Sequence, residues 1–247
     1  MSSMPAQPPS VMKAKIEPLN CYFQGKDFLG SEYWSFWGVS FLGLLIAGAV
    51  PVILLAPIYC GLVTCLLLRA KGHKFDINKL FDGFQYFGDA LIAGLMWFLF
   101  SLVFAVIFLV GLLGGMLMIS IGEPLPAIIG AFMIAMGYGT LIVGSGLMTF
   151  GLLFSAGLIV EYQMKGFDAF KLALSGVMTN FWGLLLASLV GSLIYLLGIM
   201  LCIIPGILAI PMIIAGHFMC YRKIFYGRTN PVPPVKQGPQ VVYGQYK

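Results

Sequence analysis

The chain alternates between long apolar runs and short polar segments. Four runs, at residues 33–68, 89–121, 125–160 and 181–221, are each longer than 30 residues. A helix that crosses a bilayer needs about 20 apolar residues. Each run is therefore either one long tilted helix or a hairpin of two shorter helices.

The placement of basic residues favours one of these readings. All 14 Lys and Arg fall in four segments: the N-terminal tail (Lys13, Lys15, Lys26), residues 69–79, residues 165–171 and residues 222–247. The breaks at Pro51–Pro57, at residues 121–126 and at Pro205-Gly206 contain none. Positively charged loops stay on the cytoplasmic side. Both tails and both basic loops are therefore predicted inside, and the three uncharged breaks outside.

Each stretch between basic segments must then cross the membrane an even number of times. Runs 33–68 and 181–221 become hairpins that turn at Pro51–Pro57 and at Pro205-Gly206, where proline interrupts a helix and glycine permits a tight turn. Runs 89–121 and 125–160 become two long helices that meet at Gly122-Glu123-Pro124. The sequence predicts six spans with both termini in the cytoplasm. The alternative is a single kinked helix over 33–68, which gives five spans and an external N-terminus.

The two basic loops resemble each other. Residues 71–80 contain Lys-Gly, Phe-Asp and Lys-Leu in that order, and residues 165–172 contain the same three pairs. Both loops lie on the same side, so a parallel internal repeat is expected, with chance similarity of apolar sequence as the alternative. Both loops continue as amphipathic stretches, residues 75–87 and 167–181, with Asp76 and Asp168 as N-caps. We expect two helices in the plane of the interface, or cytoplasmic extensions of the next span. Their apolar stripes are Ile77, Leu80, Phe81, Phe84 and Phe87, and Phe170, Leu174, Val177 and Phe181.

Composition agrees with an all-α, polytopic transmembrane helix bundle. Hydrophobic residues make up 60% of the 247 residues and charged residues 9%, with a mean hydropathy of +0.97. These values exclude a soluble fold, a disordered protein and a nucleic-acid binder. Three regions follow: a cytoplasmic, partly disordered tail at 1–32, a transmembrane domain at 33–227 and a Pro-rich disordered tail at 228–247. No cleavable signal peptide is expected, and we expect the bacterial cytoplasmic (inner) membrane.

Few side chains could perform chemistry. The five cysteines form no CxxC and are expected to be apolar core residues. Asp89, Glu161 and His217 are the ionisable residues at or near span ends, and intramembrane ionisable groups are the usual functional pointers. Asp89 and Glu161 are expected at headgroup level, whereas His217 either reaches the inner interface or bonds a neighbouring carbonyl. No nucleophile–base pair, nucleotide loop or metal-ligand cluster is visible, so we expect no enzyme, cofactor or metal.

Small residues predict helix contacts. Gly111 and Gly115 form a GxxxG pair. Two further small-xxx-small pairs are Ala131 with Ala135 and Ala187 with Gly191. Such pairs let helix backbones approach closely within the bundle or between copies. The tail motif Pro231-x-x-Pro234 has the form of a polyproline ligand, with a plain solvated tail as the alternative.

Two segments carry a resemblance to a known family. They are residues 55–84, with the motif positions Pro57, Gly61, Gly72, Leu80, Phe81, Gly83 and Phe84, and the last hairpin, with Gly216, His217, Tyr221 and Gly227. The chain resembles bacterial multi-span proteins related to the membrane domain of glycerophosphoryl diester phosphodiesterases. The resemblance covers most of residues 50–227. It implies a membrane bundle without the soluble phosphodiesterase domain, and therefore no established activity.

The sequence thus predicts a non-catalytic integral membrane protein that acts through helix packing and its tails. The alternative is a channel, carrier or transporter subunit for a small or lipidic solute. A cavity with convergent polar groups would favour the alternative, and a filled bundle the first. Membrane lipids are the expected partners, with self-association or another membrane protein as further options.

Overall fold

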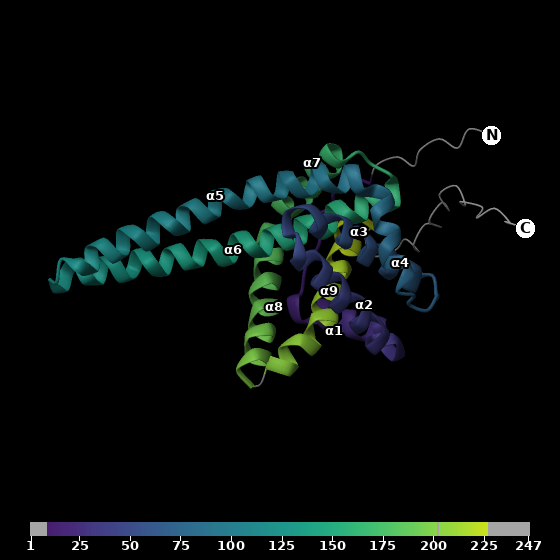
Figure 1. The fold of residues 1–247 in the computed structure, drawn as a ribbon, viewed down its shortest axis with the longest axis horizontal. Helices are drawn as coiled ribbons and strands as arrows, with labels where there is room; N and C mark the ends of the chain where they lie inside the picture. Colours follow the sequence, from purple (N-terminus) through teal and green to yellow (C-terminus); the bar gives the residue numbers. More distant parts are fainter. Residues whose placement is uncertain (1–8, 202, 227–247) are drawn as a thin grey trace, which may run out of the picture.

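The structure is a computed structural model that describes residues 9–201 and 203–226. Within these ranges the chain forms nine α-helices, two 3-10 helices and no strand, so the prediction of an all-α fold is confirmed. Figure 1 shows the elements, which are α1 (Pro18–Leu29), η1 (Gly30–Glu32), α2 (Tyr33–Ala49), α3 (Pro51–Ala70), α4 (Asn78–Phe81), η2 (Asp82–Tyr86), α5 (Phe87–Ser120), α6 (Pro124–Tyr162), α7 (Gly166–Thr179), α8 (Phe181–Leu201) and α9 (Ile203–Tyr226). The C-terminal tail at 228–247, Cys202 and Gly227 lie outside the described residues.

Five helical stretches are long and apolar enough to cross a membrane. They are Pro51–Ala70, Asn78–Ser120, Pro124–Tyr162, Phe181–Leu201 and Pro205–Tyr226. This agrees with the expected membrane protein. The remaining apolar helix, α2, has 17 residues, so it is about 26 Å long against a hydrocarbon thickness of about 30 Å.

The first apolar run is a helical hairpin. The helix breaks at Val50 (φ −140°, ψ 77°), and α3 begins at Pro51, where the missing N–H needs no acceptor. Gly43 of α2 lies against Ile58 of α3, and the Phe36 ring lies 4.8 Å from that of Phe75, beyond the far end of α3. The two arms are therefore antiparallel. The turn precedes the predicted Pro51–Pro57 segment, and Pro57 lies inside α3.

The second hairpin, α5 with α6, has the predicted turn. Gly122 adopts φ 81°, and α6 begins at Pro124. The helices have 34 and 39 residues, which makes them about 51 and 58 Å long. Figure 1 shows them side by side, extending well beyond the rest of the molecule.

The third hairpin, α8 with α9, diverges from the second (Figure 1). Helix α8 ends at Leu201 and α9 begins at Ile203, so the predicted turn at Pro205-Gly206 belongs to the first turn of α9. Gly198 and Gly206 face each other, so the two helices are close at this end.

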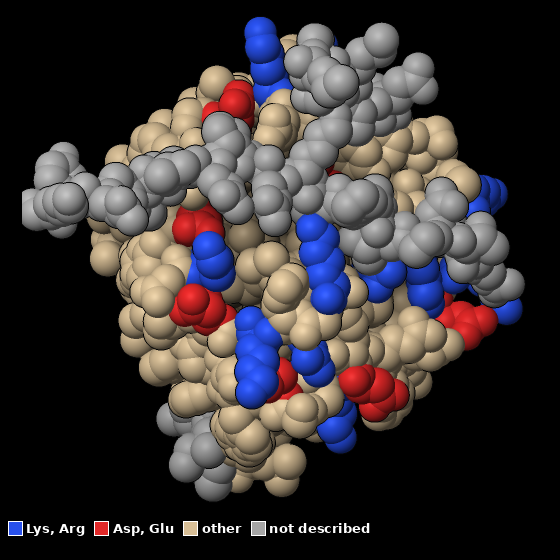
Figure 2. Space-filling model, turned by 90° about the vertical axis from the view of Figure 1, so that its right-hand side faces the viewer, with Lys and Arg blue, Asp and Glu red and all other residues tan. Residues whose placement is uncertain are grey.

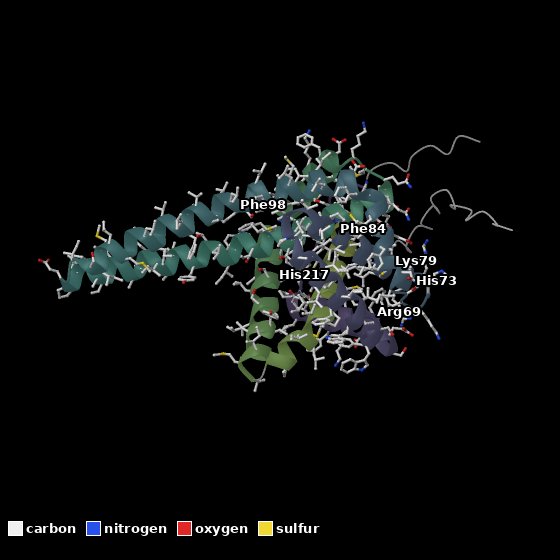
Figure 3. The ribbon with its side chains drawn as sticks, viewed as in Figure 1. Arg69, His73, Lys79, Phe84, Phe98 and His217 are labelled. Atoms are coloured by element: carbon white, nitrogen blue, oxygen red, sulfur yellow. The ribbon has the colours of Figure 1, made fainter. Side chains whose placement is uncertain are left out.

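The two basic loops lead into surface elements. The first, predicted as one helix, forms the short α4 and the 3-10 helix η2, with the Asn78 N–H bonded to Asp76 Oδ1 at 2.9 Å. The second forms the continuous helix α7. Figure 3 shows the side chains of Arg69, His73 and Lys79 at this end of the molecule, and Figure 2 shows the Lys, Arg, Asp and Glu side chains on the face at the same end.

Close backbone contact fixes η2 on α3. A Cβ atom at Gly83 would clash with the backbone of Pro57 and Gly61, and one at Gly61 would clash with Leu80. Only glycine fits these positions without a shift of the main chain.

We therefore predict that Gly83→Ala lowers the free energy of unfolding by about 1–3 kcal/mol, because the added methyl group overpacks two backbones. The control is Gly88→Ala, where nothing lies within 4 Å of a built Cβ atom, and which should be neutral or slightly stabilising. Thermal unfolding in mild detergent measures both. Equal melting temperatures for the two variants would contradict the contact.

Candidate functional site

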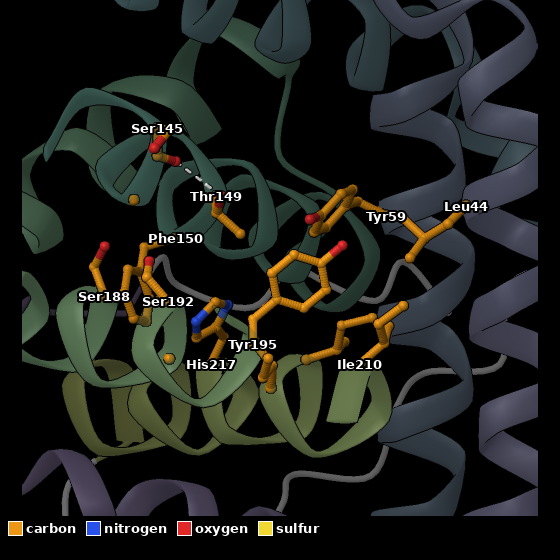
Figure 4. A pocket seen from close by; sticks show the side chains of 14 residues that line it. Leu44, Tyr59, Ser145, Thr149, Phe150, Ser188, Ser192, Tyr195, Ile210 and His217 are labelled. Carbon is orange, nitrogen blue, oxygen red and sulfur yellow. Dashed lines mark hydrogen bonds between the residues drawn. The ribbon is translucent and has the colours of Figure 1, made fainter. Parts of the chain in front are cut away.

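A cavity of about 370 Å³ lies where three hairpins meet. Its walls come from α2, α3, α6, α8 and α9 (Figure 4). The apolar part of the lining includes Leu44, Phe150 and three isoleucines of α9. The polar part consists of Tyr59, Ser145, Thr149, Ser188, Ser192, Tyr195 and His217.

The hydroxyl groups of the lining fall into two kinds. Ser145 Oγ donates to the Ile142 carbonyl, and Thr149 Oγ1 donates to the Ser145 carbonyl, each at 2.9 Å, so both are bonded within α6. The hydroxyls of Tyr59, Ser188, Ser192 and Tyr195 make no hydrogen bond to any residue that the structure describes. A polar group without a partner costs several kcal/mol in apolar surroundings. Water or a ligand in the cavity would complete the bonds of the buried Tyr59 and Ser188, whereas Ser192 and Tyr195 are exposed at its rim.

His217 is held by a bond network that starts on α1. Tyr22 Oη donates to the Ala187 carbonyl at 2.6 Å and lies 3.2 Å from His217 Nε2. Burial raises the pKa of the Tyr22 hydroxyl, so it keeps its single proton. Since that proton goes to Ala187, Nε2 must carry the hydrogen that it donates to Tyr22. The ring nitrogen Nδ1 then has a free lone pair.

The Tyr22 side chain fits a slot made by small residues. A Cβ atom at Gly191 would lie 2.5 Å from its hydroxyl, and one at Gly216 would clash with its ring. A Cβ atom at Gly25 would in turn lie 2.6 Å from the Gly216 nitrogen, so α1 and α9 touch along their backbones. Sequence reasoning missed Tyr22, because α1 has low hydropathy and its partners are 165 and 195 positions away.

The cavity lies far from the charged end of the molecule. His217 is nine residues before the end of α9 and Ser145 is 17 before the end of α6, which correspond to about 14 and 26 Å of helix. No Asp, Glu, Lys or Arg lines the cavity among the described residues. The lining thus suits an uncharged ligand with hydroxyl or carbonyl groups and an apolar part.

Asp89 and Glu161 do not reach this cavity. Asp89 Oδ1 accepts the N–H of Gly166, the first residue of α7, at 2.9 Å. A carboxylate at this position stabilises a helix N-terminus, so Asp89 anchors α7 to the start of α5. Glu161 Oε2 accepts the Tyr221 hydroxyl at 2.9 Å, and the Tyr226 hydroxyl faces the same carboxylate. His217 is thus the one of the three that contributes to the cavity.

The predicted small-residue pairs have different environments. Gly111 and Gly115 face the α6 backbone at Met133 and Gly130. Ala131 and Ala135 lie on the exposed flank of α6, outside this contact. Ala187 and Gly191 face Tyr22. Two pairs therefore contribute to internal packing, and one remains open to lipid or another protein.

No three His, Cys, Asp or Glu side chains gather as metal ligands within residues 9–201 and 203–226. Comparison with protein-family models, with curated proteins and with solved structures finds no match to this chain.

We predict that Tyr22→Phe lowers the free energy of unfolding by about 1–3 kcal/mol, because the Ala187 carbonyl and His217 Nε2–H lose their shared partner. Tyr138→Phe is the control, since that side chain is half exposed on the distal hairpin and contacts Phe108 through its ring. Thermal unfolding of both variants checks the network. A Tyr22→Phe protein as stable as the control would show that the network contributes nothing.

Proposed function

We propose that the protein is a carrier or channel subunit that binds a small uncharged, hydroxyl-bearing solute, or the uncharged head of a lipidic one. The observation that supports this is the set of four unpaired hydroxyls and one imidazole lone pair around a single cavity without charges. Hydroxyls donate and accept, and Nδ1 of His217 accepts, so the lining is complementary to hydroxyl groups of either polarity.

Packing alone does not account for this lining. A bundle core is stabilised by close contact of small and apolar groups, and serines in spans ordinarily bond the backbone of their own helix. Ser145 and Thr149 do this, but Ser188 and Ser192 do not. Tyr59 and Ser188 are 8% and 6% exposed, so leaving their hydroxyls unpaired opposes folding, and a function that uses them offsets that cost.

The proposed arrangement in the membrane has six spans, with α2 as the shortest. Both termini and the elements α4, η2 and α7 lie on the cytoplasmic side of a bacterial inner membrane. The gathering of charged side chains at one end supports this orientation (Figure 2). The parallel repeat of the two basic loops, and the resemblance to the membrane domain of glycerophosphoryl diester phosphodiesterases, stay predictions.

A second candidate is a non-catalytic protein that acts through helix contacts. The exposed pair Ala131 and Ala135 on the long α6 favours it, because small residues on a lipid-facing flank permit a close approach of another helix. The two candidates differ in whether the cavity holds water.

To separate them, we predict that Ser192→Cys reacts readily with a water-soluble methanethiosulfonate, because a hydrated cavity lets the thiol ionise. Leu193→Cys is the matched control on the next position, because both side chains are exposed but only Ser192 lines the cavity. Its thiol should react at least tenfold more slowly. Rates are measured against the parent chain with its five native cysteines.

The same variant tests ligand class. Glycerol should slow the labelling of Ser192→Cys, whereas glycerate, similar in size but anionic, should not. In proteoliposomes, labelling at position 192 should block glycerol uptake by the protein, and labelling at 193 should not. If position 192 is as unreactive as 193, the bundle is filled and the second candidate replaces the first.

The orientation is tested separately. Single cysteines at Asp168 in α7 and at Glu123 in the α5–α6 turn should react with an impermeant maleimide from opposite sides of the membrane, with Asp168→Cys inside. A third cysteine, Lys13→Cys, reports the side of the N-terminus. If it is external while residue 168 is internal, the number of spans between them is odd, and α2 is not a span.

A further inference from the structure

A second cavity lies at the charged end of the molecule and is built differently. It has a volume of about 730 Å³ and lies between an N-terminal segment, α1 and the end of α9. Four basic side chains line it, Lys13, Lys15, Arg222 and Lys223, against one carboxylate, that of Glu17. Its remaining polar groups are the amides of Asn20 and Gln24 and the phenol of Tyr226.

The wall that carries Lys13 and Lys15 is held in place by Asn180. Its Oδ1 accepts the Ala14 N–H at 2.8 Å, and its Nδ2 donates to the Met12 carbonyl at 3.0 Å. The Met12 N–H bonds the Ile224 carbonyl of α9 at 3.1 Å. The N-terminal segment is therefore fixed across α7 and α9, and its two lysines face the same space as Arg222 and Lys223.

The side chains that line this cavity carry more positive than negative charge, although the nearby Glu161 carboxylate balances part of the charge of Arg222. The C-terminal end of a helix such as α9 carries about half a negative charge, which one cation balances. Glu17 pairs with Lys15 at 3.1 Å, and Lys223 Nζ contacts Cys21 Sγ at 3.4 Å. Lys13 forms no ion pair or hydrogen bond with the described residues. An anion in the cavity would balance the excess.

An exposed apolar surface adjoins the cavity. Leu19 and Phe23 are 58% and 57% exposed and lie four residues apart, so they share one face of α1. Asn20 and Gln24, the next residues along, line the cavity. A ligand that is anionic at one end and apolar at the other would contact both surfaces.

We propose that this cavity binds the phosphate-bearing headgroup of an anionic phospholipid of the cytoplasmic leaflet, with Leu19 and Phe23 against its acyl chains. Lys13, Arg222 and Lys223 contact the phosphate, and the amides of Asn20 and Gln24 bond hydroxyls of the headgroup. Basic side chains near a membrane surface favour anionic lipid in any case. The structure adds a walled space in which they converge.

The test measures lipid binding by the full chain in neutral detergent, from the rise in melting temperature with added lipid. Short-chain phosphatidylglycerol should bind at least tenfold more tightly than phosphatidylcholine of the same chain length. Lys13→Gln/Arg222→Gln should abolish this preference. The matched control is Lys74→Gln/Lys165→Gln, which removes two exposed cations from the same end outside the cavity and should keep the affinity within twofold.

Further arms identify the source of the phosphate. Inorganic phosphate and glycerol phosphate should bind at least tenfold more weakly than phosphatidylglycerol, and Leu19→Ser/Phe23→Ser should weaken the lipid but not glycerol phosphate. Equal binding of phosphatidylglycerol and inorganic phosphate would overturn the lipid assignment. An equal loss in the control variant would reduce the effect to general surface charge.

If the double variant fails to fold, Lys13→Gln alone decides, because Lys13 is exposed and its removal breaks no contact given above. A threefold or greater loss of phosphatidylglycerol affinity supports the proposal. An unchanged affinity overturns the role of the N-terminal segment and with it the proposed site.

Discussion

Close contact between helix backbones is the constraint on which this fold depends. In a bilayer the lipid is as apolar as the helices, so burial of apolar surface does not by itself hold spans together. Contact at short range must do so, and here glycine provides it. Gly111 and Gly115 bring α5 to α6, Gly61 and Gly83 bring η2 to α3, and Gly25 and Gly216 bring α1 to α9. Each of these glycine pairs joins two different helices, so the contacts define the tertiary structure.

The cavity adjoins two such close contacts. Gly146 of α6 lies against Ser188 of α8, and Gly191 of α8 lies against Tyr22. Gly146, Ser188 and Gly191 all line the cavity, and α2, α3 and α9 complete its wall. Tyr22 does not line the cavity, but its hydroxyl fixes the imidazole of His217, which does. A helix outside the spans thus determines the geometry of a polar group within them, which couples the N-terminal segment to the cavity.

The hairpin architecture could be predicted because charge and proline act locally. The turn at Gly122 and the helical character of residues 33–226 follow from the residues themselves. The hairpin of α2 and α3 also follows, although its turn moved to Val50 because Pro51 favours the first turn of a helix. The site could be predicted only through His217. The serines could not be predicted, because most serines in spans bond their own backbone, and Ser188 and Ser192 are distinguished from Ser145 only by neighbours distant in sequence. The position of helix α1 and the bonds of Asn180 to residues 12 and 14 also depend on neighbours that are distant in sequence.

The unequal length of the hairpins has a mechanical consequence. Helix α8 matches the hydrocarbon thickness of about 30 Å when upright, whereas α5 is about 20 Å longer and apolar between Asp89 and Glu123. Leaving that excess in water would expose a long apolar surface, so the long hairpin must lean further than the short one. Packing of Gly146 of α6 on Ser188 of α8 holds the two hairpins together, and a thinner membrane would favour a greater lean of the long one against this contact. Helix α6 carries Ser145 and Thr149, and α8 carries Ser188 and Ser192, on two walls of the cavity. A change in the lean of one hairpin relative to the other would therefore change the width of the cavity.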